Sequence, residues 1–283
     1  MSDAAPIVIG ALGGSGTRVL AEALIEAGAH LGSEFNRARD NLVFTALFKR
    51  PRWFSRAGDA RIHRQLDTFV RYMRGHRYSP GDYARLAGSV IDHEPTLGLG
   101  QSARRVSRAV THRPGADAAG APVWGWKEPN SHVFLPQLID HFPGLRYVHV
   151  VRHGLDMAYT RNKTQLEIWG AHFGVPMPAG DEAAEANAQL DFWIATTRRA
   201  MDLGDRLGER FMLMRYDDLC REPERELRRL FDRAGLDVDA AALTRVAAGV
   251  ESPDSVGRWR ARGSDRFSAE QLAAVESFGF DVR

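Results

Sequence analysis

Residues 7–18 of this 283-residue chain read IVIGALGGSGTR, and they decide how the rest of the sequence is interpreted. The β-branched residues at the start are typical of a buried strand. Glycines then indicate a turn, and apolar residues recur at helical spacing as far as Gly28. A strand, a glycine loop and a helix in this order leave backbone N–H groups free to hold a phosphate or a sulfate. We therefore expect an anion-binding loop; the alternative is a tight turn that holds no ligand.

The loop differs from the phosphate loop of ATP- and GTP-binding proteins, which requires G-x-x-x-x-G-K-[ST]. Gly16 would be the second glycine of that pattern, Ala11 replaces the first, and Thr17 stands where the lysine should be. Glycines nevertheless allow the backbone to approach an anion, and the hydroxyls of Ser15 and Thr17 add donors. The residues favour anion binding without the features of an ordinary nucleotide hydrolase.

The composition is that of an ordinary globular protein, with 44% hydrophobic and 26% charged residues. A net charge of +2, with no run of lysines and arginines, argues against non-specific binding of nucleic acid. The single Cys220 excludes an intrachain disulfide. The use of one cysteine, together with the lack of a visible signal peptide or membrane-spanning run, favours a cytoplasmic protein. Arginine greatly outnumbers lysine among the 38 basic residues, a bias typical of a bacterial source.

Strands and helices are predicted to alternate along the chain. Three further strands are expected at residues 123–126, 145–151 and 211–214. Helices are expected at residues 17–27, 60–74, 79–90 and 186–207. Three more are expected: one that begins near residue 134, one that ends at about residue 234, and a last one that begins at Ser268. This alternation predicts an α/β fold with a parallel β-sheet covered by helices on both faces. We expect a single domain over residues 1–283. Residues 30–60 are predicted to be irregular, and residues 95–122 to be a long connection, with one short helix, that forms a candidate lid.

Polar groups follow all four predicted strands, at the edge of a parallel sheet where ligands gather. They are the glycine loop, Lys127 with Glu128, Arg152, and Tyr216. Arg152-His153-Gly154 also matches the tripeptide of histidine phosphatases, which in those enzymes lies near the N-terminus. Here another anion loop precedes it, so His153 is expected beside the ligand rather than as a nucleophile.

The loop resembles the 5′-phosphosulfate loop of sulfotransferases that use 3′-phosphoadenylyl sulfate (PAPS). That family has roughly [K/R]-S-G-T-T, which Ser15-Gly16-Thr17 matches, while Gly14 falls on the basic residue and Arg18 on the second threonine. The resemblance implies that the donor is bound by Gly13, Gly14, Ser15, Gly16, Thr17 and Arg18.

Two later segments resemble the parts of that family that bind the nucleotide. Arg152, with Thr160 eight positions on, is similar to the 3′-phosphate motif, in which serine is usual at the second position. Arg152 would form a bidentate hydrogen-bonded pair with that phosphate. The alternative is an ion pair with the nearby Asp156. Tyr216 matches a tyrosine that lies near the adenine. Residues 257–260, GRWR, are similar to a C-terminal segment near the 3′-phosphate, which adds Arg258 and Arg260 to the expected donor site.

Residues 124–129, WGWKEP, resemble the W-x-x-K-[DE]-P segment of bacterial sulfotransferases. The resemblance implies that Lys127 neutralises charge on the bridging oxygen as the S–O bond breaks. Glu128 is a candidate general base for the acceptor hydroxyl, and His132 is its competitor. Because Gly14 supplies no cation, we expect Lys127 and Arg18 to share that role, with Arg18 on the 5′-phosphate.

Family resemblance thus predicts a P-loop-NTPase-like sulfotransferase fold. The expected reaction moves a sulfuryl group from PAPS to a hydroxyl or amine of a small-molecule or carbohydrate acceptor, leaving adenosine 3′,5′-bisphosphate (PAP). No metal is expected, because no His, Cys or carboxylate cluster has ligand spacing. Residues 30–120 would form a mainly helical insertion on the acceptor side. Four aromatic residues would suit a sugar or a flat natural product equally: Trp53, Phe54, Trp169 and Phe173.

Two other functions stay open at this stage. A nucleotide-binding module that has lost catalysis would explain Gly14 in place of the usual cation. A kinase is the second, although the loop lacks its lysine and the strand ending at Val151 offers no acidic residue for magnesium. The sequence does not identify the acceptor, and it leaves the oligomeric state open, a homo-oligomer included.

Overall fold

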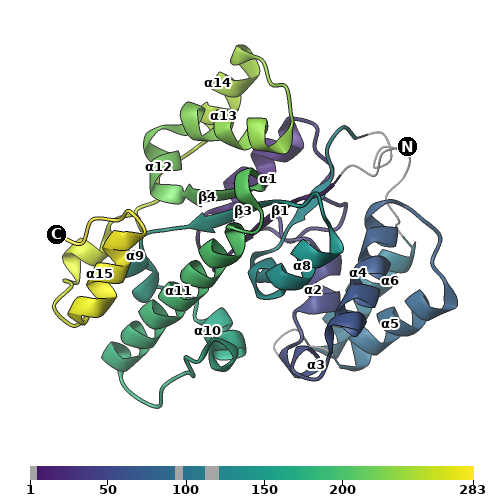
Figure 1. Cartoon of the computed structure of the whole chain (residues 1–283), viewed down its shortest axis with the longest axis horizontal. Helices are drawn as coiled ribbons and strands as arrows, with labels where there is room; N and C mark the ends of the chain where they lie inside the picture. The colour runs from purple at the N-terminus through teal and green to yellow at the C-terminus, as the bar shows by residue number, and fades with distance from the viewer. Residues whose placement is uncertain (1–4, 93–97, 112–120) are drawn as a thin grey trace.

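A parallel sheet lies at the centre of the molecule, with helices on both sides (Figure 1). The computed structural model describes residues 5–92, 98–111 and 121–283. Its strands are β1 (Ile7–Ala11), β2 (Gly125–Lys127), β3 (Arg146–Val151) and β4 (Phe211–Arg215), in the order β2-β1-β3-β4. Every neighbouring pair is parallel, so the predicted fold class is confirmed and all four carboxyl ends reach one edge of the sheet.

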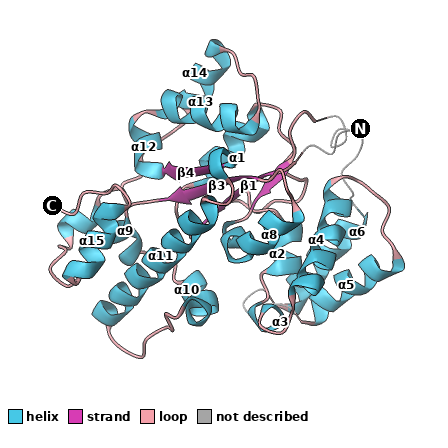
Figure 2. Ribbon diagram, viewed as in Figure 1, coloured by secondary structure: helices cyan, strands magenta, loops and turns pink. Residues whose placement is uncertain are grey.

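Each face of the sheet has its own layer of helices and its own core (Figure 2). Successive strand residues face opposite ways, so Ile7 and Ile9 pack into one core and Val8 into the other. One layer contains α1 (Thr17–Glu26), α12 (Tyr216–Arg221), α13 (Pro223–Ala234) and α14 (Ala240–Ala248). The opposite layer contains α8 (Leu135–His141), α9 (Gly154–Ala158), α10 (Thr164–Trp169) and α11 (Glu182–Gly204).

Short elements and one last helix complete the chain. The 3-10 helices are η2 (Pro129–Phe134), η3 (Gly170–Phe173), η4 (Gly208–Arg210) and η5 (Arg258–Ala261). The last helix, α15 (Ala269–Ser277), begins with the predicted capping box, in which Ser268 and Gln271 bond each other's backbone N–H. The helix predicted to reach Ala234 is two helices, α12 and α13, because Pro223 starts a new one. No described helix has the length and apolar character needed to cross a membrane.

Residues 30–111 add helices beside the β2 end of the sheet (Figure 1). They are α2 (Leu42–Phe48), α3 (Pro51–Phe54), α4 (Asp59–Met73), α5 (Pro80–Ile91) and α6 (Leu99–Thr111). α4 and α5 were predicted, but residues 30–60 are not irregular throughout. α2 is almost wholly buried, so its sequence, LVFTALF, has no polar face and no helical period.

Two expectations about this region change. Trp53 was expected to suit an acceptor, but it is only 3% exposed and packs in the core. The predicted long connection contains a full helix, α6, rather than a short one. The rest of that candidate lid, at residues 95–97 and 112–120, lies outside the described residues.

The close pairing of β1 with β2 places Lys127 at the sheet edge, and it depends on Gly125. A Cβ at this position would lie 1.7 Å from the carbonyl oxygen of Ile7. Gly125→Ala should therefore lower the free energy of unfolding by at least the upper end of the roughly 1–3 kcal/mol typical of overpacking. Chemical denaturation measures this loss. The matched control is Gly88→Ala, inside α5, where nothing lies within 4 Å of the added Cβ. It should gain about 0.5–1 kcal/mol; equal effects in both variants would contradict the account.

Candidate functional site

A cavity of about 760 Å³ lies at the carboxyl edge of the sheet. Groups that follow all four strands reach it, as the sequence predicted for strand ends: the glycine loop, Lys127, Arg152 and Tyr216. From the loop, the lining residues are Gly13, Gly14, Gly16, Thr17 and Arg18. Ser15 is buried and is not among them.

The conformation of the loop depends on glycine at residue 16. Gly14 and Gly16 have φ angles of 94° and 87°, in the left-handed region that favours glycine. A Cβ on Gly16 would also lie 2.1 Å from Cδ2 of Tyr216, so the tyrosine ring packs directly on the loop. The Tyr216 hydroxyl donates to the Glu251 carbonyl at 3.3 Å, and burial raises the pKa of Tyr216 to about 12. The tyrosine is therefore a neutral, fixed wall of the cavity.

Arg152 is a buried cation on the cavity wall with unused donors. Its side chain is 4% exposed, and Nε and Nη2 have no hydrogen-bond partner. In the alternative pair with Asp156, Nη2 of Arg152 lies 3.7 Å from the carboxylate oxygen, beyond hydrogen-bond distance. The Asp156 carboxylate instead accepts from the backbone N–H groups of Gly257 and Trp259, at 2.7 and 3.0 Å. Buried polar groups are normally satisfied, so Arg152 has N–H donors available for an anion.

The C-terminal segment reaches the neighbourhood of Arg152 but not the cavity wall. The pKa of Arg258 is lowered mainly by burial and then by the nearby positive charge of Arg152. Nε of Arg258 donates to the Ser255 carbonyl at 3.2 Å, and the Arg260 guanidinium lies 4.8 Å from the ring centroid of Trp259. Neither arginine lines the cavity.

Thr160, expected to help bind the 3′-phosphate, does not lie on a helix. It follows the end of α9, and its hydroxyl accepts from the N–H of Asn162 at 3.3 Å. Asn162, rather than Thr160, lines the cavity. The Thr160 hydroxyl therefore contacts the cavity wall only through its hydrogen bond to the backbone of Asn162.

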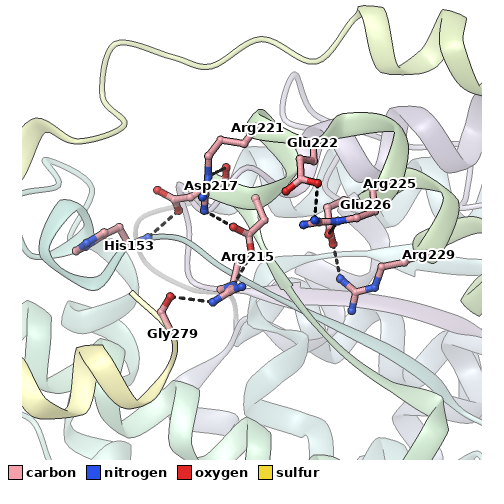
Figure 3. A network of polar contacts seen from close by, with 10 residues as sticks. His153, Arg215, Asp217, Arg221, Glu222, Arg225, Glu226, Arg229 and Gly279 are labelled. Atoms are coloured by element: carbon pink, nitrogen blue, oxygen red, sulfur yellow. Dashed lines mark hydrogen bonds and ion pairs between the residues drawn. The ribbon is translucent and has the colours of Figure 1, made fainter. Parts of the chain in front are cut away.

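His153 is held by three polar contacts outside the cavity. Its backbone N–H donates to Asp217 at 3.1 Å, in the network that follows β4 (Figure 3). Its Nδ1 accepts from the N–H of Leu155, and Nε2 contacts the Asp281 carbonyl at 2.6 Å. Both ring nitrogens are thus occupied, and His153 does not line the cavity. This geometry contradicts the nucleophilic histidine of a phosphatase.

Lys127 is a second buried cation of the cavity wall, 2% exposed. Its Nζ donates to the Ala38 carbonyl at 2.9 Å and forms an ion pair with Asp40. Both partners belong to the loop between α1 and α2, and Asn41 joins that loop to β2 by donating its N–H to the Lys127 carbonyl at 2.8 Å. Asp40 also lines the cavity.

Glu128 is buried behind a network of amide groups. Its Oε1 accepts from Asn130 at 2.8 Å and from the Thr45 hydroxyl at 3.3 Å, and Oε2 has no partner. Asn130 in turn accepts from Gln165 at 3.0 Å, and Gln165 accepts from the N–H of Gly13. A continuous chain of hydrogen bonds therefore joins Glu128 to the glycine loop, although Glu128 itself does not line the cavity.

Burial also separates His132 from the cavity. Burial, and then the nearby His149, lower the pKa of His132 well below its usual range. Neither ring nitrogen has a partner, and the ring lies 5.5 Å from that of Phe173. The four aromatic residues expected to meet an acceptor are likewise absent from the lining: Trp53, Phe54, Trp169 and Phe173. Phe54, for example, stacks edge-on against Trp169 at 5.5 Å.

Sequence reasoning missed several polar residues of the cavity wall. Arg37, Asp40 and Asn162 all line it, and none belongs to a recognisable motif. Arg37 and Asp40 lie in a basic segment that gives no periodic signal, so only the contact with Lys127 reveals their place. Within residues 5–92, 98–111 and 121–283, no group of three or more His, Cys, Asp or Glu could hold a metal ion.

Comparisons with known proteins concern the family and the fold of the chain. A family model described as the sulfotransferase family matches residues 6–240. The sulfotransferase domain of the Synechococcus PCC 7002 olefin synthase is similar in structure, with a TM-score of 0.51 at 18% identity over 98% of this chain and 96% of that one. The sulfotransferase domain from the curacin biosynthetic pathway has a TM-score of 0.56 at 12% identity over 99% of both chains. At these identities the likeness concerns the fold. No curated protein matches the chain in sequence.

The pKa of Glu128 makes a testable contribution to stability. Burial, reinforced by the charge of Asp40, raises the pKa of Glu128 from 4.5 to about 7. The folded protein therefore holds this proton more tightly than the unfolded chain does. Relative to Glu128→Gln, wild type should lose stability as the pH rises from about 4.5 to about 7, and then no more. At about 1.4 kcal/mol per pKa unit, the change is on the order of 3 kcal/mol. Urea denaturation at several pH values measures it; parallel pH curves for the two proteins would contradict a raised pKa.

Proposed function

The chain belongs to the sulfotransferase family, and from this membership we propose that it transfers a sulfuryl group from PAPS to a hydroxyl or amine of a small-molecule or carbohydrate acceptor. The observation that carries the choice of donor is the state of Arg152. It is buried on the cavity wall with two N–H nitrogens lacking a partner, next to a glycine loop suited to a second anion. Two separate anion sites in one cavity suit a nucleotide with phosphates on both its 3′ and 5′ oxygens.

The described residues fit such a donor at each of its parts. The backbone of Gly14, Gly16 and Thr17 would hold the 5′-phosphosulfate, and Arg152 the 3′-phosphate. The ring of Tyr216 supplies a flat apolar wall for the adenine. Arg258 and Arg260 add positive charge behind Arg152 rather than direct contacts.

PAPS supplies the activated sulfuryl group, and the protein supplies positioning and positive charge. The buried ammonium of Lys127 would stabilise the charge that develops on the bridging oxygen as the S–O bond breaks. Arg18, which lines the cavity from the first turn of α1, would meet the 5′-phosphate. Together they would supply the positive charge that the family's basic loop residue provides and that Gly14 does not. Glu128 and His132 remain candidate bases by sequence, but neither side chain lines the cavity.

Binding of PAP tests the donor. PAP should raise the melting temperature without added metal, because a ligand at 100 times its dissociation constant adds about 2.7 kcal/mol to the stability of the folded protein.

Arg152→Ala should weaken the binding of PAP by roughly 1.5–3 kcal/mol, the value of a hydrogen bond to a charged group. The same variant should change the binding of adenosine 5′-phosphate little, and calorimetry with both ligands provides the internal control. Equal losses for the two ligands would place Arg152 away from the 3′-phosphate. A shift with ATP and magnesium but none with PAP would favour a kinase.

The two proposed cations should differ in their effects. Lys127→Ala should reduce PAPS turnover by about 10²–10³-fold, as when one transition-state donor is removed. PAP keeps the bridging oxygen on its 5′-phosphate, which the glycine loop and Arg18 would also hold, so Lys127→Ala should weaken PAP binding far less than it slows turnover. Arg18→Ala should weaken PAP itself, since the 5′-phosphate is present in substrate and product. The matched control is Lys163→Ala, which removes a lysine paired with Glu185 away from the cavity. Normal turnover in Lys127→Ala would refute the role given to Lys127. Absence of PAPS turnover in a wild-type protein that binds PAP would indicate a module without catalysis.

A further inference from the structure

Asp40 is the acidic residue of the cavity wall that contacts a proposed catalytic cation. Four acidic residues line the cavity: Glu22, Glu26, Asp40 and Glu251. Glu22 pairs with Arg18 and Arg39 on the exposed side of α1, and Glu26 pairs with Arg245. Glu251 lies beside Tyr216, at the end of the cavity proposed for the adenine. Among these residues, only Asp40 forms an ion pair with Lys127.

The loop that carries Asp40 is held in one conformation. Asn36 organises it, because its Oδ1 accepts from the N–H groups of Ala38 and Asp40, both at 2.9 Å, and its Nδ2 donates to the Asp40 carboxylate at 2.8 Å. Arg39 has a φ of 62°, the one left-handed non-glycine residue among those described. Backbone strain of this kind persists where the surroundings impose it, and it is common at functional sites. The Asp40 carboxylate is therefore positioned rather than free to rotate.

Position distinguishes Asp40 from the bases nominated by sequence. Asp40 lines the cavity and its side chain is 19% exposed, whereas Glu128 is buried among Thr45 and Asn130. The negative charge of Asp40 helps to raise the pKa of Glu128, so the two carboxyl groups are close enough to interact. A base must also be within reach of the acceptor's proton, and of Asp40 and Glu128 only Asp40 lines the cavity.

We propose that Asp40 is the general base that takes the proton from the acceptor hydroxyl, an inference that rests on the proposed function. The O–H proton passes to the Asp40 carboxylate while the hydroxyl oxygen forms the new S–O bond. The S–O bond to the 5′-phosphate breaks, and its electron pair stays on the phosphate oxygen of PAP, next to Lys127. The proton then leaves Asp40 for solvent. In this arrangement Asp40 serves the entering oxygen and Lys127 the leaving one.

Asp40→Asn separates a base from a structural support, because removing a base near bound anions has opposite effects on turnover and binding. PAP affinity, measured by calorimetry, should be equal to wild type or several-fold tighter, since a negative charge leaves the cavity. Consumption of PAPS, with water standing in for the acceptor and release of sulfate as the signal, should fall about 10²–10⁴-fold. Acetate should restore part of the activity of Asp40→Ala, by replacing the missing carboxylate. Glu182→Gln is the matched control: it removes one negative charge away from the cavity, where Glu182 pairs with Arg262, and should leave both measurements unchanged.

The outcomes separate this inference from the function on which it rests. Wild-type consumption of PAPS by Asp40→Asn would overturn the assignment of the base and leave the proposed function intact. Parallel losses of PAP binding and PAPS consumption would make Asp40 a structural partner of Lys127, which also overturns it. If the wild-type protein binds PAP but consumes no PAPS, the transferase function itself fails and the inference falls with it.

Discussion

The site depends on one steric constraint, the direct packing of the Tyr216 ring on residue 16. A Cβ there would lie 2.1 Å from the ring, and the φ of 87° independently favours glycine. This contact joins the ends of β1 and β4, the central and the edge strand that carry the loop and the tyrosine. The contact thus fixes the loop beside the cavity that Tyr216, Arg152 and Lys127 also line.

Buried charge then sets the chemistry of the cavity. Arg152 and Lys127 are both almost fully buried, and moving a cation out of water is costly unless a partner replaces the lost solvation. Lys127 has such partners in Ala38 and Asp40. Two nitrogens of Arg152 have no hydrogen-bond partner, because Asp156 accepts from the backbone N–H groups of residues 257 and 259 instead. This difference suits two roles: Arg152 would bind an anion, while Lys127 would stabilise charge that appears during reaction.

The strands and the convergence of their ends could be predicted from the sequence, because short runs rich in β-branched residues and bounded by turn residues are typical of buried parallel strands. Family resemblance added Lys127, Arg152 and Tyr216, and all three line one cavity. Helix α2 was not predicted, because a helix buried on every side has no amphipathic period.

The polar surroundings were harder to predict. Asp40 lies in an arginine-containing loop that also has Glu34, and its partner, Lys127, lies in a different part of the chain. The burial of Glu128 and His132 likewise follows from contacts between distant segments, such as Thr45 with Glu128. Residue type and order identify a candidate base, but only packing shows whether that base faces the cavity.

The most direct test of the central claim is the fate of PAPS labelled in its sulfuryl group. The wild-type protein, incubated with a chelator and a set of polyols and phenols, should convert PAPS to PAP in step with the appearance of label on an acceptor or in sulfate. ATP with magnesium should remain intact under parallel conditions. Unchanged PAPS in the presence of a protein that hydrolyses or transfers phosphate from ATP would contradict the account.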